Sequence, residues 1–301
     1  MSRRISALQR IKNFRPGTTL VMLLVVLIWV TPTIGLVVTA FRPQMDSVTS
    51  GWWTALFNPG GQHWTFDALK GVFSSTWNIG DSFMSTIAIA VPATILPITF
   101  AAFAAYGFTF LEFRGREVWF SVIIGLMIIP MQAVIVAVLK GFIALDKFLY
   151  TLPFNKTGWL HLAGEYPAAW IVHSAFAMPL AVYILRNYMM TLPSALIEAA
   201  RIDGASHFRI FRSLVIPMSV PALASFAIFQ FLWVWNDYFV AFLFAGRHPV
   251  MTYKILSMLG QHGEGWQIVM AGCLVSMLVP LTVFFSLQRY FVRGLTAGSV
   301  K

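Results

Sequence analysis

Long apolar runs alternate with short polar intervals along the chain. Six runs are each long enough for a helix to cross a bilayer, which takes about 20 residues. These runs are Thr18–Phe41, Ser82–Phe108, Val118–Phe142, Tyr166–Tyr188, Ser219–Ala245 and Trp266–Phe291. Prolines inside several runs predict packed helices, because neighbouring helices must satisfy the carbonyl groups that a proline leaves unbonded. The pattern predicts an all-α integral membrane protein with six transmembrane helices.

The polar intervals divide the chain into segments. The expected segments are an N-terminal segment at 1–17, a first transmembrane helix at 18–41, a loop at 42–81, a core at 82–293 and a tail at 294–301. The first run is longer than the apolar core of a signal peptide, so we expect a retained helix. The loop is rich in turn residues and predicts short surface helices.

One polar interval, at 191–217, separates the fourth and fifth spans and predicts two short helices. Pro193 suits a first helical turn, since the N–H it lacks would be unpaired there. Gly204 is expected to end the first helix in a left-handed conformation, and Ser206 to cap the second. The expected apolar faces are Leu196, Ala199 and Ala200 on the first helix, and Phe208, Phe211 and Val215 on the second.

Composition and charge support a membrane protein. The chain is 58% hydrophobic and 11% charged, against roughly 25% charged residues in soluble domains. The net charge of +10 comes from basic residues that flank the apolar runs, so nucleic acid is not an expected partner. Of the 21 Lys and Arg residues, 14 fall on the side of both termini and of 191–217. The positive-inside rule therefore predicts that both termini and this interval are cytoplasmic.

Recognisable catalytic motifs are absent from the sequence. It has no G-x-x-x-x-G-K-[ST] phosphate loop, no H-E-x-x-H metal helix and no G-x-S-x-G elbow. We therefore do not expect an enzyme, and we expect no catalytic residues, no metal site and no cofactor bound by this chain. If transport is driven by ATP, ATP and Mg would be bound by a partner ATPase. The single cysteine, Cys273, has no intrachain partner for a disulfide.

Polar residues at membrane depth are candidates for a translocation path, because a charge there is costly. The candidates in the fifth span are Gln230, Trp233, Asn236 and Asp237. Asp237 has two readings of equal weight, a group facing a partner or a water-filled path, and a structural acid near the outer interface. The indole of Trp233 could offer a flat face to a sugar ring, although tryptophan in a span more often packs or anchors at the interface.

The interval at 191–217 carries a long and specific pattern. Its residues are Glu198, Ala199, Ala200, Asp203, Gly204, Ala205 and Pro217. This spacing resembles the EAA loop of the permease subunits of binding-protein-dependent ABC importers. The resemblance implies a cytoplasmic coupling helix, between transmembrane helices 4 and 5, that docks on a separate ATP-hydrolysing subunit.

Two further stretches resemble the carbohydrate group of these permeases. The tail at 294–301 resembles that of the second permease of maltose importers, and the run at 216–237 resembles alpha-glucoside permeases. The resemblance implies a heterodimer with a second permease subunit, two ATP-binding subunits and an extracytoplasmic solute-binding protein. It also implies a sugar substrate, which would be an oligosaccharide, an alpha-glucoside or a related polyol. The expected location is the cytoplasmic (inner) membrane of a bacterium or archaeon.

The same resemblance implies contacts with partner proteins for one outer loop and for the C-terminal tail. The outer loop at 246–265 would reach the binding protein through Gly260, His262, Gly263 and Glu264. The tail would insert between the ATPase subunits through Gly294, Gly298, Ser299 and Lys301. Each has a plain alternative, because glycine-rich turns are common and a short polar tail normally frays.

Two other classes of protein compete with an ABC permease. An ion-coupled secondary transporter would use Asp237 as its proton or sodium site, but the two halves show no matching interrupted spans. A membrane-embedded enzyme would need a catalytic constellation, and the sequence shows none.

Overall fold

A computed structural model describes residues 16–156, 158, 160–259 and 265–297, and its regular elements are all helical. The longer helices are α2 (Pro16–Ala40), α6 (Ile79–Phe110), α7 (Arg116–Gly125), α8 (Met131–Thr151), α9 (Tyr166–Met189), α12 (Ile216–Trp235) and α15 (Trp266–Ala297). The short ones are α3 (Gln44–Thr49), α4 (Trp53–Phe57), α5 (Asp67–Val72), α10 (Ser194–Ile202), α11 (His207–Ile210), α13 (Phe239–Phe244) and α14 (Met251–Ser257). Single 3₁₀ turns are η1 (Pro59–Gly61), η2 (Leu126–Ile128) and η3 (Pro153–Asn155), and η4 (Phe211–Val215) is a π-turn. The predicted all-α class is confirmed.

Helices long and apolar enough to cross a membrane match the predicted spans. Within the described residues there are five such helices, and a bent pair of helices makes a sixth candidate. The interval after the first span also carries the short helices that its turn residues predict, α3, α4 and α5.

The third span differs from the single helix expected over Val118–Phe142. It is broken at Pro130, where the helix that ends at Ile128 and the helix that begins at Met131 are bent by 101°. Pro130 cannot donate a helical hydrogen bond and pushes the preceding residue into extended backbone, so Ile129 has ψ 114. The prediction of one continuous helix here was wrong.

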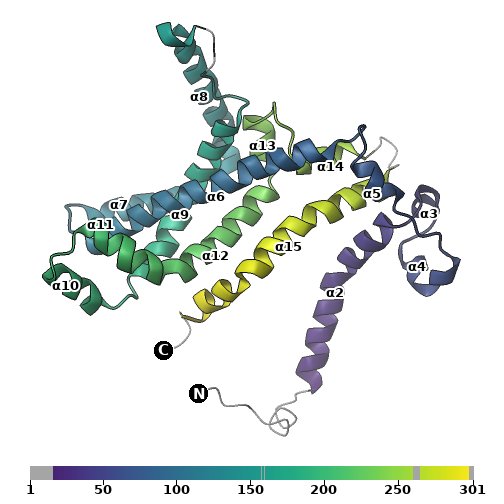
Figure 1. The fold of residues 1–301 in the computed structure, drawn as a ribbon, viewed down its shortest axis with the longest axis horizontal. Helices are drawn as coiled ribbons and strands as arrows, with labels where there is room; N and C mark the ends of the chain where they lie inside the picture. Colours follow the sequence, from purple (N-terminus) through teal and green to yellow (C-terminus); the bar gives the residue numbers. More distant parts are fainter. Residues whose placement is uncertain (1–15, 157, 159, 260–264, 298–301) are drawn as a thin grey trace. The chain divides into compact units, whose positions relative to one another are not determined.

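The fifth span also breaks, although Ser219–Ala245 was expected to be one helix. Helix α12 ends at Trp235, and α13 begins only at Phe239. Helix α15 is longer than the expected sixth span, since it runs to Ala297 and includes residues 294–297 of the predicted tail. Figure 1 shows these elements along the chain.

The chain divides into two units. The first consists of Met1–Trp77 with Ser257–Val275, and the second of Asn78–Leu256 with Ser276–Lys301. In the described part of the first unit, Phe41 and Phe66 pack edge to face and the Thr65 N–H bonds to the Phe41 carbonyl at 2.9 Å. These contacts tie the end of α2 to the segment before α5.

The core of the second unit forms where α6, α9 and α12 lie side by side (Figure 1). Small side chains let these helices approach closely, as is usual in membranes. The fully buried alanines of α6 and α9 are Ala90, Ala93, Ala101, Ala105, Ala168, Ala169 and Ala181. Polar contacts add to this packing, since the Trp170 indole donates to the Ala88 carbonyl at 2.8 Å. In Figure 1, α10 and α11 lie at one end of this bundle and α13 at the other.

Candidate functional site

The turn between α10 and α11 has the local structure that its sequence predicts. Gly204 has φ +77, and the Ala205 N–H returns to the Ala200 carbonyl at 2.9 Å, which closes the first helix. The Ser206 hydroxyl then caps α11 by accepting a hydrogen bond from the Arg209 N–H at 3.3 Å. The expected left-handed glycine and serine cap are both confirmed. By contrast, Pro193 precedes α10 as its N-cap and does not lie in its first turn, and the second helix, expected to be short, continues through η4 into α12.

Polar contacts fix the hairpin to the end of α6. Arg201 donates from Nη2 to the Phe110 carbonyl at 2.9 Å, and His207 Nδ1 lies 3.1 Å from the Tyr106 hydroxyl. Near this end, Arg186 donates two hydrogen bonds to Glu117 at 2.8 and 2.9 Å. The hairpin is therefore held by α6, while α7 and α9 are tied to each other beside it.

The faces of the two short helices differ from the expectation. Helix α10 buries Ile197, whereas Leu196 is 47% exposed and Ala199 is exposed as well. In the second helix, Phe211 and Val215 are buried as expected, but Phe208 is 62% exposed. Helical periodicity shows that a helix has apolar positions on one side. In these short helices, apolar residues occupy two neighbouring faces, and packing against the bundle determines which face is buried.

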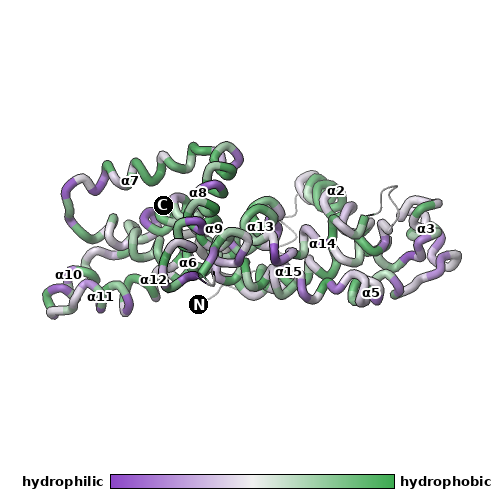
Figure 2. Tube along the Cα trace, turned by 90° about the horizontal axis from the view of Figure 1, so that it is seen from above, coloured by the Kyte–Doolittle hydropathy of each residue, from purple (hydrophilic) through white to green (hydrophobic). Residues whose placement is uncertain are grey.

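The outer side of the hairpin consequently carries uncovered apolar groups beside polar ones. Leu196, Ile202 and Phe208 are all large and exposed, and Glu198 and Asp203 are exposed with them. Figure 2 shows hydrophilic and hydrophobic residues mixed along this hairpin. Such a surface can bury apolar area and pair charge against another protein.

The wide turn η4 directly precedes helix α12. Pro217 is the second residue after this turn and the second residue of α12, and it is exposed. A proline cannot donate to the carbonyl four residues before it, and its ring crowds that carbonyl. A π-turn relieves this crowding, and such turns often occur at functional sites.

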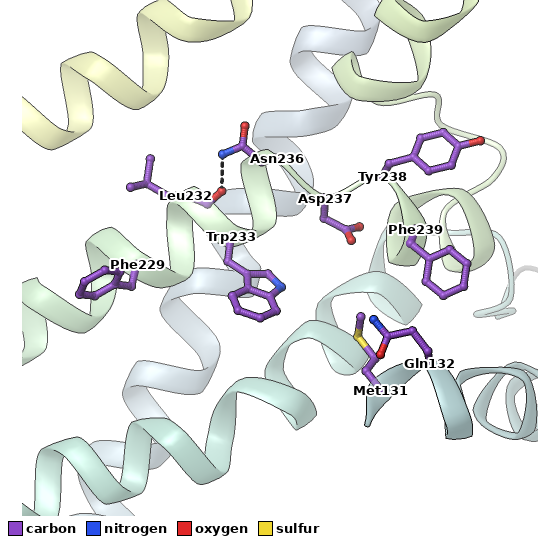
Figure 3. A pocket seen from close by; sticks show the side chains of 9 residues that line it. All are labelled: Met131, Gln132, Phe229, Leu232, Trp233, Asn236, Asp237, Tyr238 and Phe239. Carbon is purple, nitrogen blue, oxygen red and sulfur yellow. Dashed lines mark hydrogen bonds between the residues drawn. The ribbon is translucent and has the colours of Figure 1, made fainter. Parts of the chain in front are cut away.

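A cavity of about 650 Å³ lies in the second unit, where α12 ends and α8 begins. Its lining residues are Met131, Gln132, Phe229, Leu232, Trp233, Asn236, Asp237, Tyr238 and Phe239. Both helix breaks, at Pro130 and after Trp235, open onto it. In Figure 3 the Trp233 indole, the Asp237 carboxylate and the Gln132 amide all point toward this space.

Asp237 is held in place by several contacts at the helix break. Its Oδ2 accepts a hydrogen bond from the Ala241 N–H at 2.9 Å and lies 3.6 Å from His173 Nε2. The Asp237 and His173 side chains are only 8% and 3% exposed. Asp237 therefore fits both readings, since it anchors the first turn of α13 and also lines the cavity.

Two predicted path residues are placed differently. Gln230 is buried away from the cavity, because its amide donates to the Ala93 carbonyl of α6 at 3.1 Å. Asn236 lines the cavity, but its amide donates to the Leu232 carbonyl at 2.8 Å and turns back along its own helix (Figure 3). Gln132, a weaker candidate because a lone glutamine in a span more often forms an interhelical hydrogen bond, lines the cavity as well.

A second cluster that the sequence analysis missed joins two polar intervals of the second unit. The Glu165 carboxylate accepts from Arg247 at 2.9 Å, and it meets His161 and His248 at 3.0 and 2.8 Å. The hydrogen bond from His248 is the main cause that lowers the Glu165 pKa to about 2. A signal existed in the sequence, because the predicted topology puts both intervals on one side of the membrane.

Several predicted contact residues lie outside the described residues. These are Gly260, His262, Gly263, Glu264, Gly298, Ser299 and Lys301. Gly294 is described as backbone within α15. Within the described ranges, no group of three His, Cys, Asp or Glu residues could hold a metal ion.

Comparisons with known proteins agree on one family. The family described as "binding-protein-dependent transport system inner membrane component" matches residues 97–297. The osmoprotective compounds uptake permease protein GgtD of Synechocystis sp. is 42% identical over 284 residues, which is 93% of this chain and 90% of that protein. The alpha-glucoside transport system permease protein AglG of Rhizobium meliloti is 45% identical over 79% of this chain, but the match spans only 60% of that protein.

A solved structure has the same fold. The crystal structure is that of a bacterial ABC transporter involved in the import of the acidic polysaccharide alginate. One of its chains matches with a TM-score of 0.69 and 20% identity, and the match covers 96% of this chain and 100% of that one.

Proposed function

Because this chain belongs to the family of inner-membrane components of binding-protein-dependent transport systems, we propose that it forms the translocation path for a sugar in an ATP-driven importer. As a member of this family with several membrane-length helices, it is a multi-pass protein of the inner membrane. The proposed substrate class is an oligosaccharide, an alpha-glucoside or a related polyol. The named roles of the two relatives, osmoprotectant uptake and alpha-glucoside transport, support this class.

The observation that carries the proposal is the cavity between the two helix breaks. It offers an exposed indole on Trp233, an amide on Gln132 and a carboxylate on Asp237. Aromatic faces bind the apolar face of a sugar ring, and amide and carboxylate groups bind its hydroxyls. A path for a neutral, hydroxyl-rich molecule needs these groups at membrane depth, where they are otherwise costly.

The α10–α11 hairpin would couple ATP hydrolysis on a partner subunit to transport through this chain. We propose that its outer surface docks on an ATP-binding subunit, with Glu198, Ala199 and Ala200 as the coupling residues. Supporting this role, the exposed Leu196, Ile202 and Phe208 find no cover within the described chain. ATP and Mg would be bound by that partner, and this subunit would carry out no hydrolysis.

The proposed assembly contains a second permease subunit, two ATP-binding subunits and a solute-binding protein outside the membrane. Both termini and the hairpin would face the cytoplasm, as the positive-inside count favours. The interval at 246–265 would then face the binding protein, and the tail at 294–301 the ATPase subunits. The placement of the Glu165 cluster beside 246–248, at the far end from the hairpin, is consistent with this orientation.

An ion-coupled transporter with Asp237 as the ion site is not supported by the family assignment, since this family works with binding proteins. The same carboxylate also has a structural role that needs no ion, because it holds the first turn of α13.

The test is uptake of a labelled alpha-glucoside into proteoliposomes that contain the purified importer and its binding protein. We expect uptake only with ATP on the side of the hairpin, and no loss when ionophores collapse proton and sodium gradients. ADP in place of ATP is the matched control. Uptake that proceeds without ATP and stops with a protonophore would contradict the proposal.

A further inference from the structure

Arg42 is buried at the end of α2 in the first unit, with 1% of its surface exposed. Its Nη1 donates to the Ser50 carbonyl at 3.1 Å, and its Nη2 donates to the Asp46 carbonyl at 2.9 Å and to the Ser50 hydroxyl. These acceptors lie at the end of α3, so the guanidinium closes that short helix. All three acceptors are neutral.

The charge of Arg42 therefore has no anion in the described part of the chain. No carboxylate among those residues forms an ion pair with it, and its Nε–H makes no hydrogen bond. The nearby Ser47 hydroxyl is also buried without a partner. A buried cation with neutral acceptors and a free donor is costly unless an anion completes its surroundings.

Arg42 and Ser47 line one cavity of about 320 Å³, within the size range of small-molecule sites. Its other polar lining includes Ser50 and the indoles of Trp52 and Trp266, and no acidic residue lines it. Neither indole N–H makes a hydrogen bond among the described residues. The cavity thus presents one positive charge and several donors, which is the chemistry that binds an anion.

The cavity has two chemically different ends. Arg42, Ser47 and Ser50 form the polar end, whereas Pro32 and Leu36 of α2 form an apolar wall. A side chain at Gly35 would lie 2.9 Å from the Trp52 ring, so the glycine lets this indole pack against α2. An amphiphile with an anionic group and an apolar stem fits such a cavity better than a small free anion does.

From this arrangement we propose that the cavity binds a phosphate ester, with Arg42 Nε and the Ser47 hydroxyl as its donors. Its position where the apolar run of α2 ends, beside two tryptophans, corresponds to the depth of phospholipid headgroups. The headgroup of an anionic phospholipid supplies both the phosphate and the apolar stem. Free phosphate carries the same chemistry without the stem.

The test uses the assembled importer, purified and freed of lipid in a sugar-based detergent. Short-chain phosphatidylglycerol is added, and bound lipid is counted by native mass spectrometry. Parallel samples receive inorganic phosphate, or a diglucosyl lipid with the same chains and no phosphate. We expect one bound phosphatidylglycerol for each copy of this chain, and we expect that the glucosyl lipid does not displace it. Protection against thermal unfolding by phosphatidylglycerol alone indicates a headgroup, and protection by inorganic phosphate as well indicates a free anion. Protection by neither would overturn the proposal.

Two variants separate binding from folding. Ser47→Ala leaves every hydrogen bond of Arg42 in place and is expected to weaken binding at least about tenfold, since it removes a hydrogen bond to a charged group. Arg42→Gln is expected to abolish binding. Lys70→Gln, which removes an exposed charge from the same unit, is the matched control and should bind normally. Unchanged binding by Ser47→Ala would contradict the proposal even if Arg42→Gln fails to assemble.

Discussion

The Glu165 carboxylate and the His248 imidazole lie 83 residues apart in the chain, and their Oε2 and Nε2 atoms are 2.8 Å apart. The His248 and Tyr166 rings stack with centroids 3.9 Å apart, and the Gly164 N–H bonds to the Phe244 carbonyl at 3.1 Å. The start of α9 is thereby joined to the segment that follows α13.

Replacing Glu165 by Gln should lower the melting temperature of the purified importer at neutral pH. The hydrogen bond from His248 lowers the Glu165 pKa from 4.5 to about 2; partial burial opposes this shift, and His161 and Arg247 add to it. Because the folded-state pKa is the lower one, the stabilisation is full above about pH 4.5 and is lost as the pH falls toward 2. After a discount for solvent screening we expect about 1–2 kcal/mol.

Glu112→Gln is the control, because Glu112 is exposed and forms no ion pair among the described residues. The difference in melting temperature between wild type and Glu165→Gln should shrink as the pH is lowered through this window. A difference that stays constant from pH 7 to pH 3 would show that ionisation of Glu165 does not stabilise the fold.

Gly204→Ala should reduce the sugar transported per ATP hydrolysed. A Cβ at Gly204 meets no atom within 4 Å, so the cost arises only from the left-handed backbone at φ +77, and it is about 1 kcal/mol. This strain falls on the turn that sets the direction of α10. Gly141→Ala adds the same methyl group inside α8, where nothing lies within 4 Å either, and should transport normally. If both variants transported the same amount of sugar per ATP hydrolysed, the conformation of the hairpin would have no role in coupling ATP hydrolysis to transport.

Trp233→Ala should raise the KM for sugar uptake, because it removes an aromatic face from the cavity without opening the core. Stacking of this kind contributes about 0.5–1.5 kcal/mol, which predicts a rise of roughly two- to tenfold. Trp29→Ala is the control, since Trp29 of α2 is similarly exposed, at 78% against 67%, and is not one of the residues that line the cavity. An unchanged KM for Trp233→Ala would remove this indole from the proposed path.

Prolines show what the sequence could and could not predict. Pro92, Pro97 and Pro179 remain inside continuous helices, whereas Pro130 breaks its span and bends it by 101°. Each proline removes the same N–H, so the outcome depends on whether neighbouring helices satisfy the freed carbonyl group. Whether a neighbouring helix satisfies this carbonyl cannot be read from the local sequence. The lengths of the apolar runs therefore predict the six spans but do not predict the break at Pro130.

The candidate sites were also predictable from the sequence only in part. Gly204 and Ser206 were predictable, because a left-handed turn and a helix cap depend on single residues and their neighbours. The orientation of Gln230 was not, since it depends on the packing of α12 against α6. The burial of Arg42 was not predictable either, since it depends on how α3 folds back against the guanidinium. Sequence patterns therefore located the hairpin but assigned the cavity only in part.

The helical stretch from His207 to Trp235 is continuous for 29 residues, through the π-turn and α12. At 1.5 Å per residue it is a rod about 43 Å long. One end of this rod is the hairpin that holds Ser206, and the other carries Trp233 just before the backbone breaks. If the hairpin tilts, we expect this helix to move its Trp233 end, and with it the cavity wall, sideways.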